Sequence, residues 1–380
     1  MSTMRPLADD PTVVTRILDH IDNKTTDLGD SSWREPVANY RCPARFAVER
    51  EKVLRRYPIG FCPSAALGKP GAWVARDAAG TPILAVRGND GKVRAFRNAC
   101  RHRGTQIAAG TGCDMSFVCR YHGWTYALDG SLRHVPHEHG FPGLDKTARG
   151  LVPMEAVESQ GIVFVRQDGP ALGDAHLDEL PPLLPAGYRC TGSTELETPV
   201  NWKVFAEGFL EGYHIRSTHP ETFFPVQFDN LNVVESFGRN NRIAFPFHAI
   251  HRTRKQPPAE RSADGKLTYL YNLFPNVMIA TFPGRIIMVV LEPLAVDRTL
   301  LVTYALTNID ASSEDAQSML EAGGSLITAG AIEDREVACA IQRGLGSQAN
   351  EYFEFGLFEG AIGHFHRELD AAVDAVGGVA

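Results

Sequence analysis

Short runs of hydrophobic residues, separated by turn-forming residues, dominate the stretch from about residue 57 to residue 167. Clear examples of these β-prone runs are residues 72–76 and 161–166. Asn-Asp-Gly at 89–91 and Leu-Asp-Gly at 128–130 lie between such runs and are typical of tight turns between paired strands. The pattern therefore predicts a small domain built from β-strands.

Three longer hydrophobic runs follow one another later in the chain, at residues 276–282, 285–292 and 299–306. Because they are consecutive and only a few residues apart, we expect them to pair as neighbours in an antiparallel sheet. Helical patterns precede and follow them. The predicted fold class is therefore α+β, with a small β-rich domain and a larger domain in which helices flank an antiparallel sheet.

The start and the middle of the chain suggest where these domains end. Residues 13–21 have helical periodicity, and we expect the Pro-containing stretch after them to be an extended arm. Residues 167–185 are rich in Pro, Gly, Asp and Leu, as linkers are. We therefore predict an N-terminal helical arm at 1–56 that packs on the last domain, the β domain at 57–167 and the larger domain at 168–380.

Composition excludes several classes of partner. The 380-residue chain has a net charge of −7 and no long basic run, which argues against nucleic acid or an acidic membrane surface. Its most apolar run, 285–292, is too short to span a bilayer, and the polar N-terminus lacks the apolar core of a signal peptide. Seven widely spread cysteines favour a reducing compartment, and so the cytoplasm, over a disulfide framework. Among them Cys113 is expected to be a small buried residue.

Two short motifs carry the most informative chemistry. Cys100 and His102 are separated by one residue, Cys119 and His122 by two, and sixteen residues lie between the motifs. Zinc sites usually place two like ligands in each motif, whereas here each motif supplies one thiolate and one imidazole. A Rieske 2Fe-2S centre has two Cys on one iron and two His on the other, so two such loops can hold one cluster. The alternatives are a structural zinc site and two unrelated Cys-His pairs.

A second group of candidate ligands lies in residues 201–220. Glu211 and His214 are three residues apart and would project side by side from a helix. His214 and His219 are about 140° apart on an ideal helix, so both can bind one metal ion only if the helix ends between them. Pro220 and its neighbours favour such a break. The alternative is that both are ordinary surface histidines.

A two-His-one-carboxylate iron site needs a third ligand. Helical spacing places Asp334 in a stripe that is otherwise apolar. The stripe consists of Ala331, Asp334, Ala338, Ile341 and Leu345. A carboxylate that faces the core is costly unless it is paired or binds a metal, so Asp334 is the candidate, while Glu333 is expected on an exposed face. The alternative is that Asp334 pairs with a buried arginine.

Together the motifs resemble the α subunits of Rieske non-haem iron oxygenases over most of the chain, from about Pro58 to Gln342. The resemblance implies four ligands for one 2Fe-2S cluster and three for one mononuclear Fe(II) in each subunit. These are Cys100, His102, Cys119 and His122 for the cluster, and His214, His219 and Asp334 for the iron. It also implies that Glu211 carries hydrogen bonds between the two kinds of site, in a head-to-tail homotrimer where one subunit's cluster serves its neighbour's iron.

The activity that the resemblance implies is that of a terminal oxygenase, which hydroxylates a small organic substrate with dioxygen. Electrons from NAD(P)H would arrive through a separate reductase, with or without a ferredoxin, because the chain has no Gly-x-Gly-x-x-Gly motif after a strand. His ligation raises the potential of such a cluster to roughly −150 to +300 mV, against about −400 mV for plant-type clusters. The alternatives are an electron carrier, which needs the β domain alone, and an inactive regulatory relative.

The substrate is less constrained. Five phenylalanines follow the histidine pair, and core packing is their expected use, with an aromatic-lined pocket as the alternative. They are Phe223, Phe224, Phe228, Phe245 and Phe247. His248 and His251 are more typical of surface residues than of substrate ligands, and Gly208, where many relatives have Asn, indicates a roomier pocket. The string at 273–276 resembles relatives that act on quaternary ammonium compounds, and the alternative is ring hydroxylation or demethylation of an aromatic acid.

Overall fold

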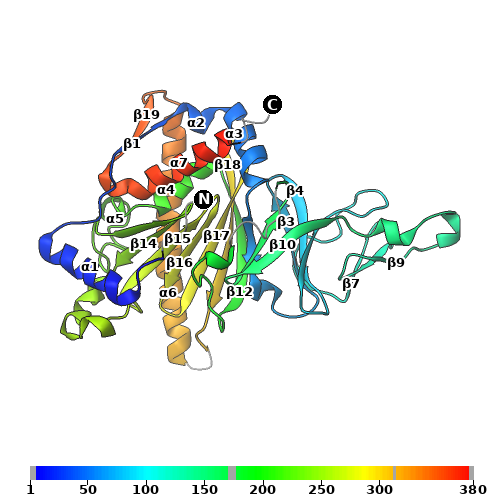
Figure 1. Ribbon diagram of the computed structural model, residues 1–380, viewed down its shortest axis with the longest axis horizontal. Helices are drawn as coiled ribbons and strands as arrows, with labels where there is room; N and C mark the ends of the chain where they lie inside the picture. Colours follow the sequence, from blue (N-terminus) through cyan, green and yellow to red (C-terminus); the bar gives the residue numbers. More distant parts are fainter. Residues whose placement is uncertain (1–5, 170–176, 311–313, 376–380) are drawn as a thin grey trace. The chain divides into compact units, whose positions relative to one another are not determined.

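The computed structural model describes residues 6–169, 177–310 and 314–375, in two compact units (Figure 1). One unit comprises Leu54–Cys190 and is called the β unit here. The other joins Met1–Val53 to Thr191–Ala380 and is called the mixed unit. Segments from both ends of the chain therefore form the mixed unit, and the middle third of the chain forms the β unit. Part of the linker expected at 167–185 lies outside the described residues.

The β unit is built on two antiparallel sheets, of seven and three strands. In spatial order the larger sheet contains β2 (Ile59–Pro63), β11 (Ile162–Arg166), β10 (Pro153–Ser159), β5 (Val93–Arg97), β4 (Thr81–Arg87), β3 (Ala72–Ala78) and β6 (Gly110–Cys113). The smaller sheet contains β7 (Ser116–Val118), β8 (Thr125–Ala127) and β9 (Leu132–His134). The two predicted turns join β4 to β5 and β8 to β9, which confirms the β-strand pattern.

The mixed unit contains a second seven-stranded sheet and a two-stranded one. In spatial order the large sheet contains β12 (Arg189–Thr198), β18 (Arg298–Thr307), β17 (Arg285–Ala295), β16 (Val277–Phe282), β15 (Leu267–Leu273), β14 (Asn240–Pro246) and β13 (Val233–Phe237). The three predicted consecutive strands are β16, β17 and β18, and they pair antiparallel as expected. Strand β1 (Trp33–Pro36) pairs with β19 (Tyr352–Phe355). The α+β class is confirmed.

Helices of the mixed unit come from both ends of the chain. They are α1 (Asp10–Asn23), α2 (Ala38–Arg41), α3 (Pro43–Glu49), α4 (Trp202–Phe209), α5 (Ile215–Thr218), α6 (Glu314–Leu345) and α7 (Gly360–Asp374). The first is the predicted helix, and Asp9 caps its N-terminus by accepting from the Thr12 amide. The expectation of an extended arm after it was wrong for residues 38–49, because Pro43 stands at the first turn of α3, where its fixed φ favours a helix.

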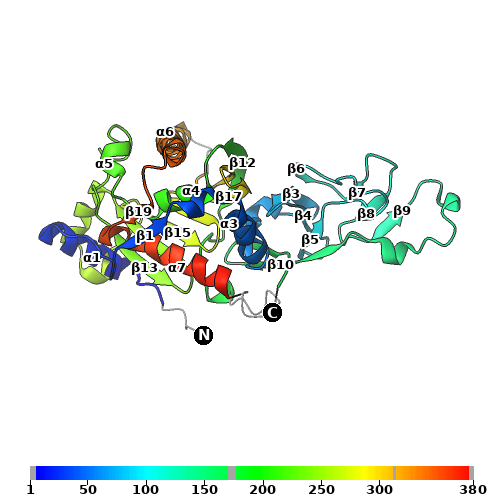
Figure 2. The same cartoon turned by 90° about the horizontal axis from the view of Figure 1, so that it is seen from above.

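Helix α4 lies between α6 and β17, and it brings the candidate ligand segment next to the sheet (Figure 2). Asn201 begins this helix: its side-chain oxygen accepts from the Lys203 amide at 3.0 Å. Every residue from Asn201 to Glu207 is buried, including two charged ones. The Lys203 ammonium is 3.0 Å from the Glu49 carboxylate, and both side chains are at most 1% exposed. This buried ion pair fixes the start of α4 against the N-terminal segment.

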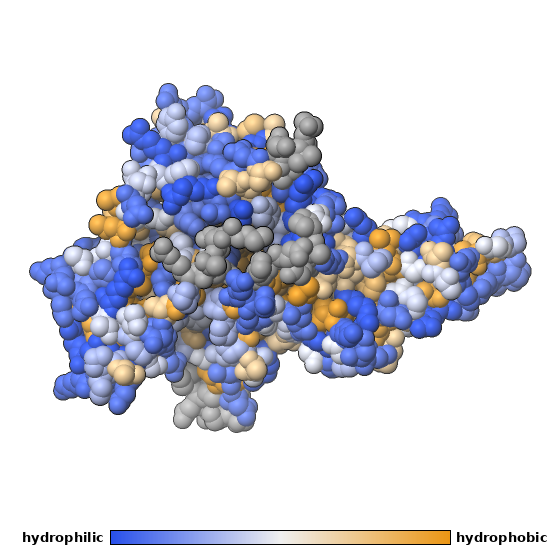
Figure 3. All heavy atoms as spheres, in the orientation of Figure 1, coloured by the Kyte–Doolittle hydropathy of each residue, from blue (hydrophilic) through white to orange (hydrophobic). Residues whose placement is uncertain are grey.

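The face of the molecule drawn in Figure 3 is mostly hydrophilic, and its apolar side chains lie in small groups among polar ones. None of the described helices combines the length and hydropathy that a bilayer span requires. All seven cysteines are free thiols in the structure. Cys113 is exposed, contrary to expectation, because it ends β6, the edge strand of its sheet.

The buried pair predicts a stability difference. Glu49→Gln leaves the Lys203 ammonium buried without its carboxylate partner, so the free energy of urea unfolding should fall by about 3 kcal/mol. Glu354→Gln is the matched control, because the Arg34–Glu354 pair is more than half exposed on both sides and should contribute nothing measurable. Equal unfolding midpoints for the two variants would contradict this account of α4.

Candidate metal sites

The two Cys-His loops of the β unit have the same backbone hydrogen-bond pattern. In the first loop the Cys100 amide donates to the Thr105 carbonyl at 2.8 Å, and the Gly104 amide donates to the Cys100 carbonyl at 2.9 Å. In the second loop the amides of Cys119 and Gly123 make the equivalent bonds, at 2.8 and 2.9 Å. Both glycines have a positive φ, of 77° and 73°, which residues with a Cβ rarely adopt. The chain therefore presents two alike loops, each with one thiol and one imidazole.

The imidazoles of the two loops lie beside each other. The ring centroids of His102 and His122 are 4.7 Å apart, and Trp124 stacks on His102 at 4.9 Å. The Nδ1 atom of His102 is buried and has no hydrogen-bond partner among the described residues, which suits a nitrogen that binds a metal. Burial, followed by the neighbouring His122 and the charge of Arg103, lowers the pKa of His102 and so favours the neutral ring that metals bind.

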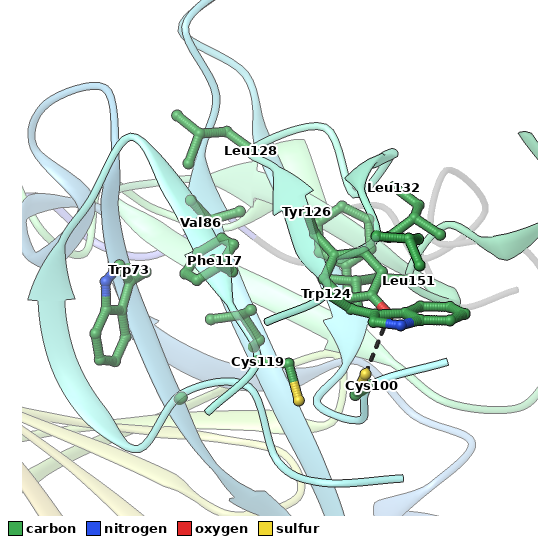
Figure 4. Close-up of a cluster of buried hydrophobic side chains, with 14 residues drawn as sticks. Trp73, Val86, Cys100, Phe117, Cys119, Trp124, Tyr126, Leu128, Leu132 and Leu151 are labelled. Atoms are coloured by element: carbon green, nitrogen blue, oxygen red, sulfur yellow. Dashed lines mark hydrogen bonds between the residues drawn. The ribbon is translucent and has the colours of Figure 1, made fainter. Parts of the chain in front are cut away.

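The two thiols are buried at one edge of the apolar core of the β unit (Figure 4). The Tyr126 hydroxyl lies 3.3 Å from the Cys100 sulfur and accepts a hydrogen bond from the Arg101 amide at 2.9 Å. Its own hydrogen is therefore free to point at the sulfur. Burial and then the contact with Cys100 raise the pKa of Tyr126, so the hydroxyl keeps its proton. Such a donor stabilises negative charge on a ligating thiolate.

A second group of ligand atoms converges in the mixed unit. His214, His219 and Asp334 each offer one atom, and these three atoms lie within 4.8 Å of one another. The Asp334 Oδ1 atom is 2.9 Å from Nε2 of His219 and 3.5 Å from Nε2 of His214. The alternative pairing of Asp334 with an arginine is wrong, because its partners are the two imidazoles. Two histidines and one carboxylate on one side of an ion are the donor set of non-haem iron sites.

The outer nitrogens of both imidazoles are held by carboxylates. Nδ1 of His214 makes a short hydrogen bond to Glu211. Nδ1 of His219 lies 2.7 Å from Glu333, which also accepts from the Thr222 hydroxyl at 2.6 Å. With Nδ1 donating to a carboxylate, each Nε2 lone pair is left for a metal. The expectation that Glu333 is an exposed bystander was wrong, since Glu333 fixes the ring of His219.

The backbone around the two histidines differs from the expected helix that breaks before Pro220. Helix α4 ends at Phe209, and the four-residue helix α5 lies between His214 and His219, which flank it as its caps. The Glu211 carboxylate accepts from the His214 amide at 3.1 Å and so directs the turn between the helices. His219 leaves the helical conformation, with φ −116° and ψ 45°, so the separation of about 140° on an unbroken helix does not apply. The ring centroids of His214 and His219 are therefore only 5.2 Å apart.

The apolar stripe expected on α6 is incomplete. Ala338 and Leu345 are buried, but Ala331 is exposed and Ile341 is 37% exposed. The argument still holds for Asp334, whose carboxylate faces His214 and His219, the two residues that flank α5. The stripe failed because a helix of 32 residues extends past the elements that it packs against.

The charges at this group favour a cation at its centre. Burial alone would lower the pKa of His214, but hydrogen bonds with Asp334 and Glu211 outweigh it and raise the pKa to about 10. The His219 pKa is raised by the same opposition, and the two imidazoles lower the pKa of Asp334 although burial alone would raise it. A metal cation competes with these protons for the Nε2 atoms.

Two family models match the chain. The model of the Rieske [2Fe-2S] domain matches residues 58–148, and that of the ring hydroxylating alpha subunit (catalytic domain) matches residues 186–375. The chain belongs to the α subunits of Rieske non-haem iron oxygenases. It is therefore an oxidoreductase of the Rieske oxygenase type, which confirms the family resemblance of the motifs.

Relatives of this oxygenase subunit fall into two groups. The carnitine monooxygenase oxygenase subunit of Escherichia coli K12 is 28% identical over 367 residues, which cover 89% of this chain and 93% of the relative. The glycine betaine monooxygenase oxygenase subunit of Chromohalobacter salexigens is 26% identical and covers 92% and 88%. The large oxygenase component of the naphthalene 1,2-dioxygenase system of Pseudomonas aeruginosa is 34% identical, but over 46% of this chain and 42% of that relative.

Solved structures of both groups share the fold. The quaternary ammonium Rieske monooxygenase CntA superposes with a TM-score of 0.77 at 21% identity, over 98% of this chain and 99% of that one. Naphthalene 1,2-dioxygenase with indole bound superposes with a TM-score of 0.72 at 20% identity, over 92% and 93%. At such identities the likeness is one of fold, and it does not distinguish the two groups.

The phenylalanines after the histidine pair have different positions. Phe223 is half-buried and packs edge-on against His219, with ring centroids 4.9 Å apart. Phe228 contacts the rings of His248 and His251, both of which are exposed as expected of surface histidines. A Cβ at Gly208 would meet no atom within 4 Å, so this position borders open space.

Phe223 depends on a glycine of α6, which generates a prediction. A Cβ at Gly330 would lie 2.3 Å from the Phe223 ring. Gly330→Ala must therefore displace this ring, which packs against His219. We expect it to lower the unfolding free energy by about 1–3 kcal/mol and to weaken Fe(II) binding to the mixed unit, measured by competition with a chelator.

The control for this prediction lies on the same helix. A Cβ at Gly323 would meet no atom within 4 Å, so Gly323→Ala should keep the iron affinity and gain up to about 1 kcal/mol of stability. Unchanged Fe(II) affinity in Gly330→Ala would show that Phe223 does not support the site.

Proposed function

We propose that this α subunit is the terminal oxygenase of a multicomponent system and hydroxylates a small organic substrate. Dioxygen and two electrons, with two protons, would convert one C–H bond to C–OH and release one water. The observation that carries the proposal is the convergence of His214, His219 and Asp334, with both imidazoles held from behind by carboxylates. An electron carrier needs no such group, and an inactive relative would be expected to have lost a ligand.

The cluster assignment rests on the two matched loops. Cys100 and Cys119 would hold one iron, and His102 and His122 the other. The orphaned Nδ1 of His102 and the Tyr126 hydroxyl beside Cys100 both fit this assignment. The cluster would supply electrons one at a time, while the protein holds the His ligands near the surface, since His122 is exposed.

The iron assignment rests on a donor set of three protein side chains, His214, His219 and Asp334. Three protein ligands leave positions for dioxygen, and the iron would supply oxygen activation. The protein's own contribution is to fix both rings through Glu211 and Glu333 and to place substrate beside Phe223. Glu211 would also bind His122 of a neighbouring subunit, in a head-to-tail trimer that receives its electrons from a reductase.

Quaternary ammonium compounds are the favoured substrate class. The relatives that cover most of this chain are named for carnitine, glycine betaine and choline. Carboxylates surround His214, His219 and Asp334, which are called the iron group here. These carboxylates and the face of Phe223 suit a cationic nitrogen. Aromatic hydrocarbons are the second candidate, because the naphthalene dioxygenase component has the higher identity over the part that it matches.

A substrate screen tests the function. The purified subunit with a generic reductase and NADH is given L-carnitine, glycine betaine, choline, naphthalene or indole, and oxygen uptake and product are measured. We expect substrate-dependent uptake with at least one quaternary amine. Turnover of naphthalene alone would select the second candidate, and iron-loaded protein that oxidises none of a broad panel would refute the oxygenase proposal.

The cluster ligands predict a spectroscopic loss. Cys100→Ala or His122→Ala should abolish the visible Rieske absorption and all NADH-driven turnover, because each cluster iron has only two protein ligands. Cys113→Ala, at an exposed position outside the motifs, should keep both. Full absorption in the Cys100→Ala protein would rule out the assignment.

The carboxylates of α6 predict a graded loss of iron. Asp334→Ala should keep the cluster absorption but lose the mononuclear iron and product formation. Glu333→Gln should keep a bound iron with an affinity lowered about 10- to 100-fold, since it weakens the support of a ligand. The exposed Glu336→Ala is the control, and iron quantitation on all three decides; loss of iron in Glu333→Gln but not in Asp334→Ala would reverse the roles.

The acidic bridge predicts a kinetic effect. Glu211→Gln retains an acceptor for His214 but removes the charge that is proposed to link the iron to the neighbouring cluster. Both metal sites should load, whereas single-turnover product formation should fall at least about tenfold. Near-normal rates with intact iron, equal to those of the exposed control Glu221→Gln, would refute the bridge.

A further inference from the structure

Tyr40, in the N-terminal segment, contacts both ends of α4. Its carbonyl accepts from the Asn201 side-chain amide at 3.1 Å, at the start of the helix. Its hydroxyl donates to the Glu207 carboxylate at 2.5 Å, in the last full turn. Tyr40 is fully buried. One residue from the far N-terminal part of the sequence therefore fixes the length and the direction of the helix that leads to the iron group.

The Glu207 carboxylate belongs to a buried polar group that extends away from the iron. The oxygen that accepts from Tyr40 also lies 2.8 Å from Nε2 of His366 on α7. Nδ1 of His366 is 3.3 Å from Glu35, whose carboxylate also accepts from the Trp33 indole at 2.9 Å. His366 and Glu35 are each 1% exposed. Because buried carboxylates are costly without partners, this group holds its members in one arrangement.

The chain leads directly from Glu207 to the residues of the iron group. The Leu210 amide donates to the Glu207 carbonyl at 2.9 Å and ends α4. Glu211 follows at once, and its carboxylate accepts from the amide and from Nδ1 of His214. His214 therefore lies seven positions after the buried anchor at Glu207, and hydrogen bonds close both intervening turns. A shift of Glu207 would move Glu211 and the ring that it holds.

The opposite end of α4 is tied to the helix that carries the third ligand. The Asn201 amide donates to Oε1 of Gln342 on α6 at 2.9 Å. Gln342 lies eight residues after Asp334 on the same helix. The N-terminal segment thus contacts α4 at two residues. One is Asn201, which also bonds to α6, and the other is Glu207, which precedes His214.

We propose that Tyr40, Glu207 and His366 are positioning residues of the iron site, and that residues 33–40 are part of its machinery. This inference rests on the proposed function, because it assumes that iron binds His214. The three residues do not touch iron or substrate. They hold the last turn of α4 so that Glu211 presents His214 to the metal in the correct orientation.

Tyr40→Phe is the sharpest test, because it removes one hydrogen-bond donor to a charged group and keeps the ring. We expect the affinity for Fe(II) to fall between about tenfold and a hundredfold, which is the range for one such bond. The ligand-field absorption of Co²⁺ bound at the iron site should also shift, since the angle of the His214 ring changes. Both readouts are independent of any substrate.

Tyr269→Phe is the matched control. Tyr269 is also buried and donates to a carboxylate, Asp10, at 2.9 Å, but it lies on β15 and contacts neither α4 nor α6 in the described hydrogen bonds. It should lose comparable stability and keep the wild-type Fe(II) affinity and Co²⁺ spectrum. If Tyr40→Phe and Tyr269→Phe bind Fe(II) equally well, the positioning inference is wrong.

A second pair of variants keeps the test open if one protein folds poorly. Glu207→Gln removes the buried charge and should weaken Fe(II) binding more than Tyr40→Phe does. His366→Gln with Glu207→Gln replaces the imidazole and the carboxylate by two amides. It should restore the melting temperature that each single variant loses, but not the iron affinity. Recovery of both would assign the group to stability alone and overturn the inference. A wild-type protein that binds no iron at His214 would instead refute the proposed function.

Discussion

The candidate metal site of the mixed unit depends on one constraint. Two imidazoles must face the same carboxylate, and neither ring may be free to rotate. Each ring is held at Nδ1 by a carboxylate, Glu211 or Glu333, so that Nε2 points at Asp334. A histidine that is held at one nitrogen has a fixed tautomer and a fixed ring plane. Hydrogen bonds of the fold therefore fix the orientation of both rings, which limits the side-chain freedom that metal binding would have to remove.

This construction sets the charge of the site. Three carboxylates surround two imidazoles, which are neutral in the form that binds metal, so the group is strongly anionic until a cation enters. The raised pKa of both histidines expresses the same excess of negative charge, because protons take the place of the ion. A bound divalent ion removes the repulsion among these carboxylates. Three carboxylates and one divalent ion leave a net negative charge, and the proposal of a cationic substrate rests partly on that charge.

Sequence analysis succeeded where the chemistry is local. Each cluster loop closes within about five residues, so the spacing of Cys100, His102 and Gly104 already contains the hydrogen bonds that shape it. The β-strands of both units were predictable for the same reason, since alternation and turns act over short distances. Asp334 was found because a carboxylate breaks an apolar pattern, although only part of that pattern is buried.

The failures share a physical cause, which is contact between residues far apart in the sequence. Glu333 was taken as exposed because helical periodicity describes one helix and not what approaches it, and His219 approaches from 114 residues away. The break after α4 is the exception, because it is local: the Glu211 side chain competes with the helix for the His214 amide three residues later. Tyr40 lies 167 residues from Glu207, and no local pattern marks a tyrosine as the partner of a buried acid. Residues that hold a ligand from far away in the sequence, as Glu333 holds His219, are therefore the part of such a site that only a three-dimensional structure identifies. Glu211, three residues from His214, was within reach of a local pattern.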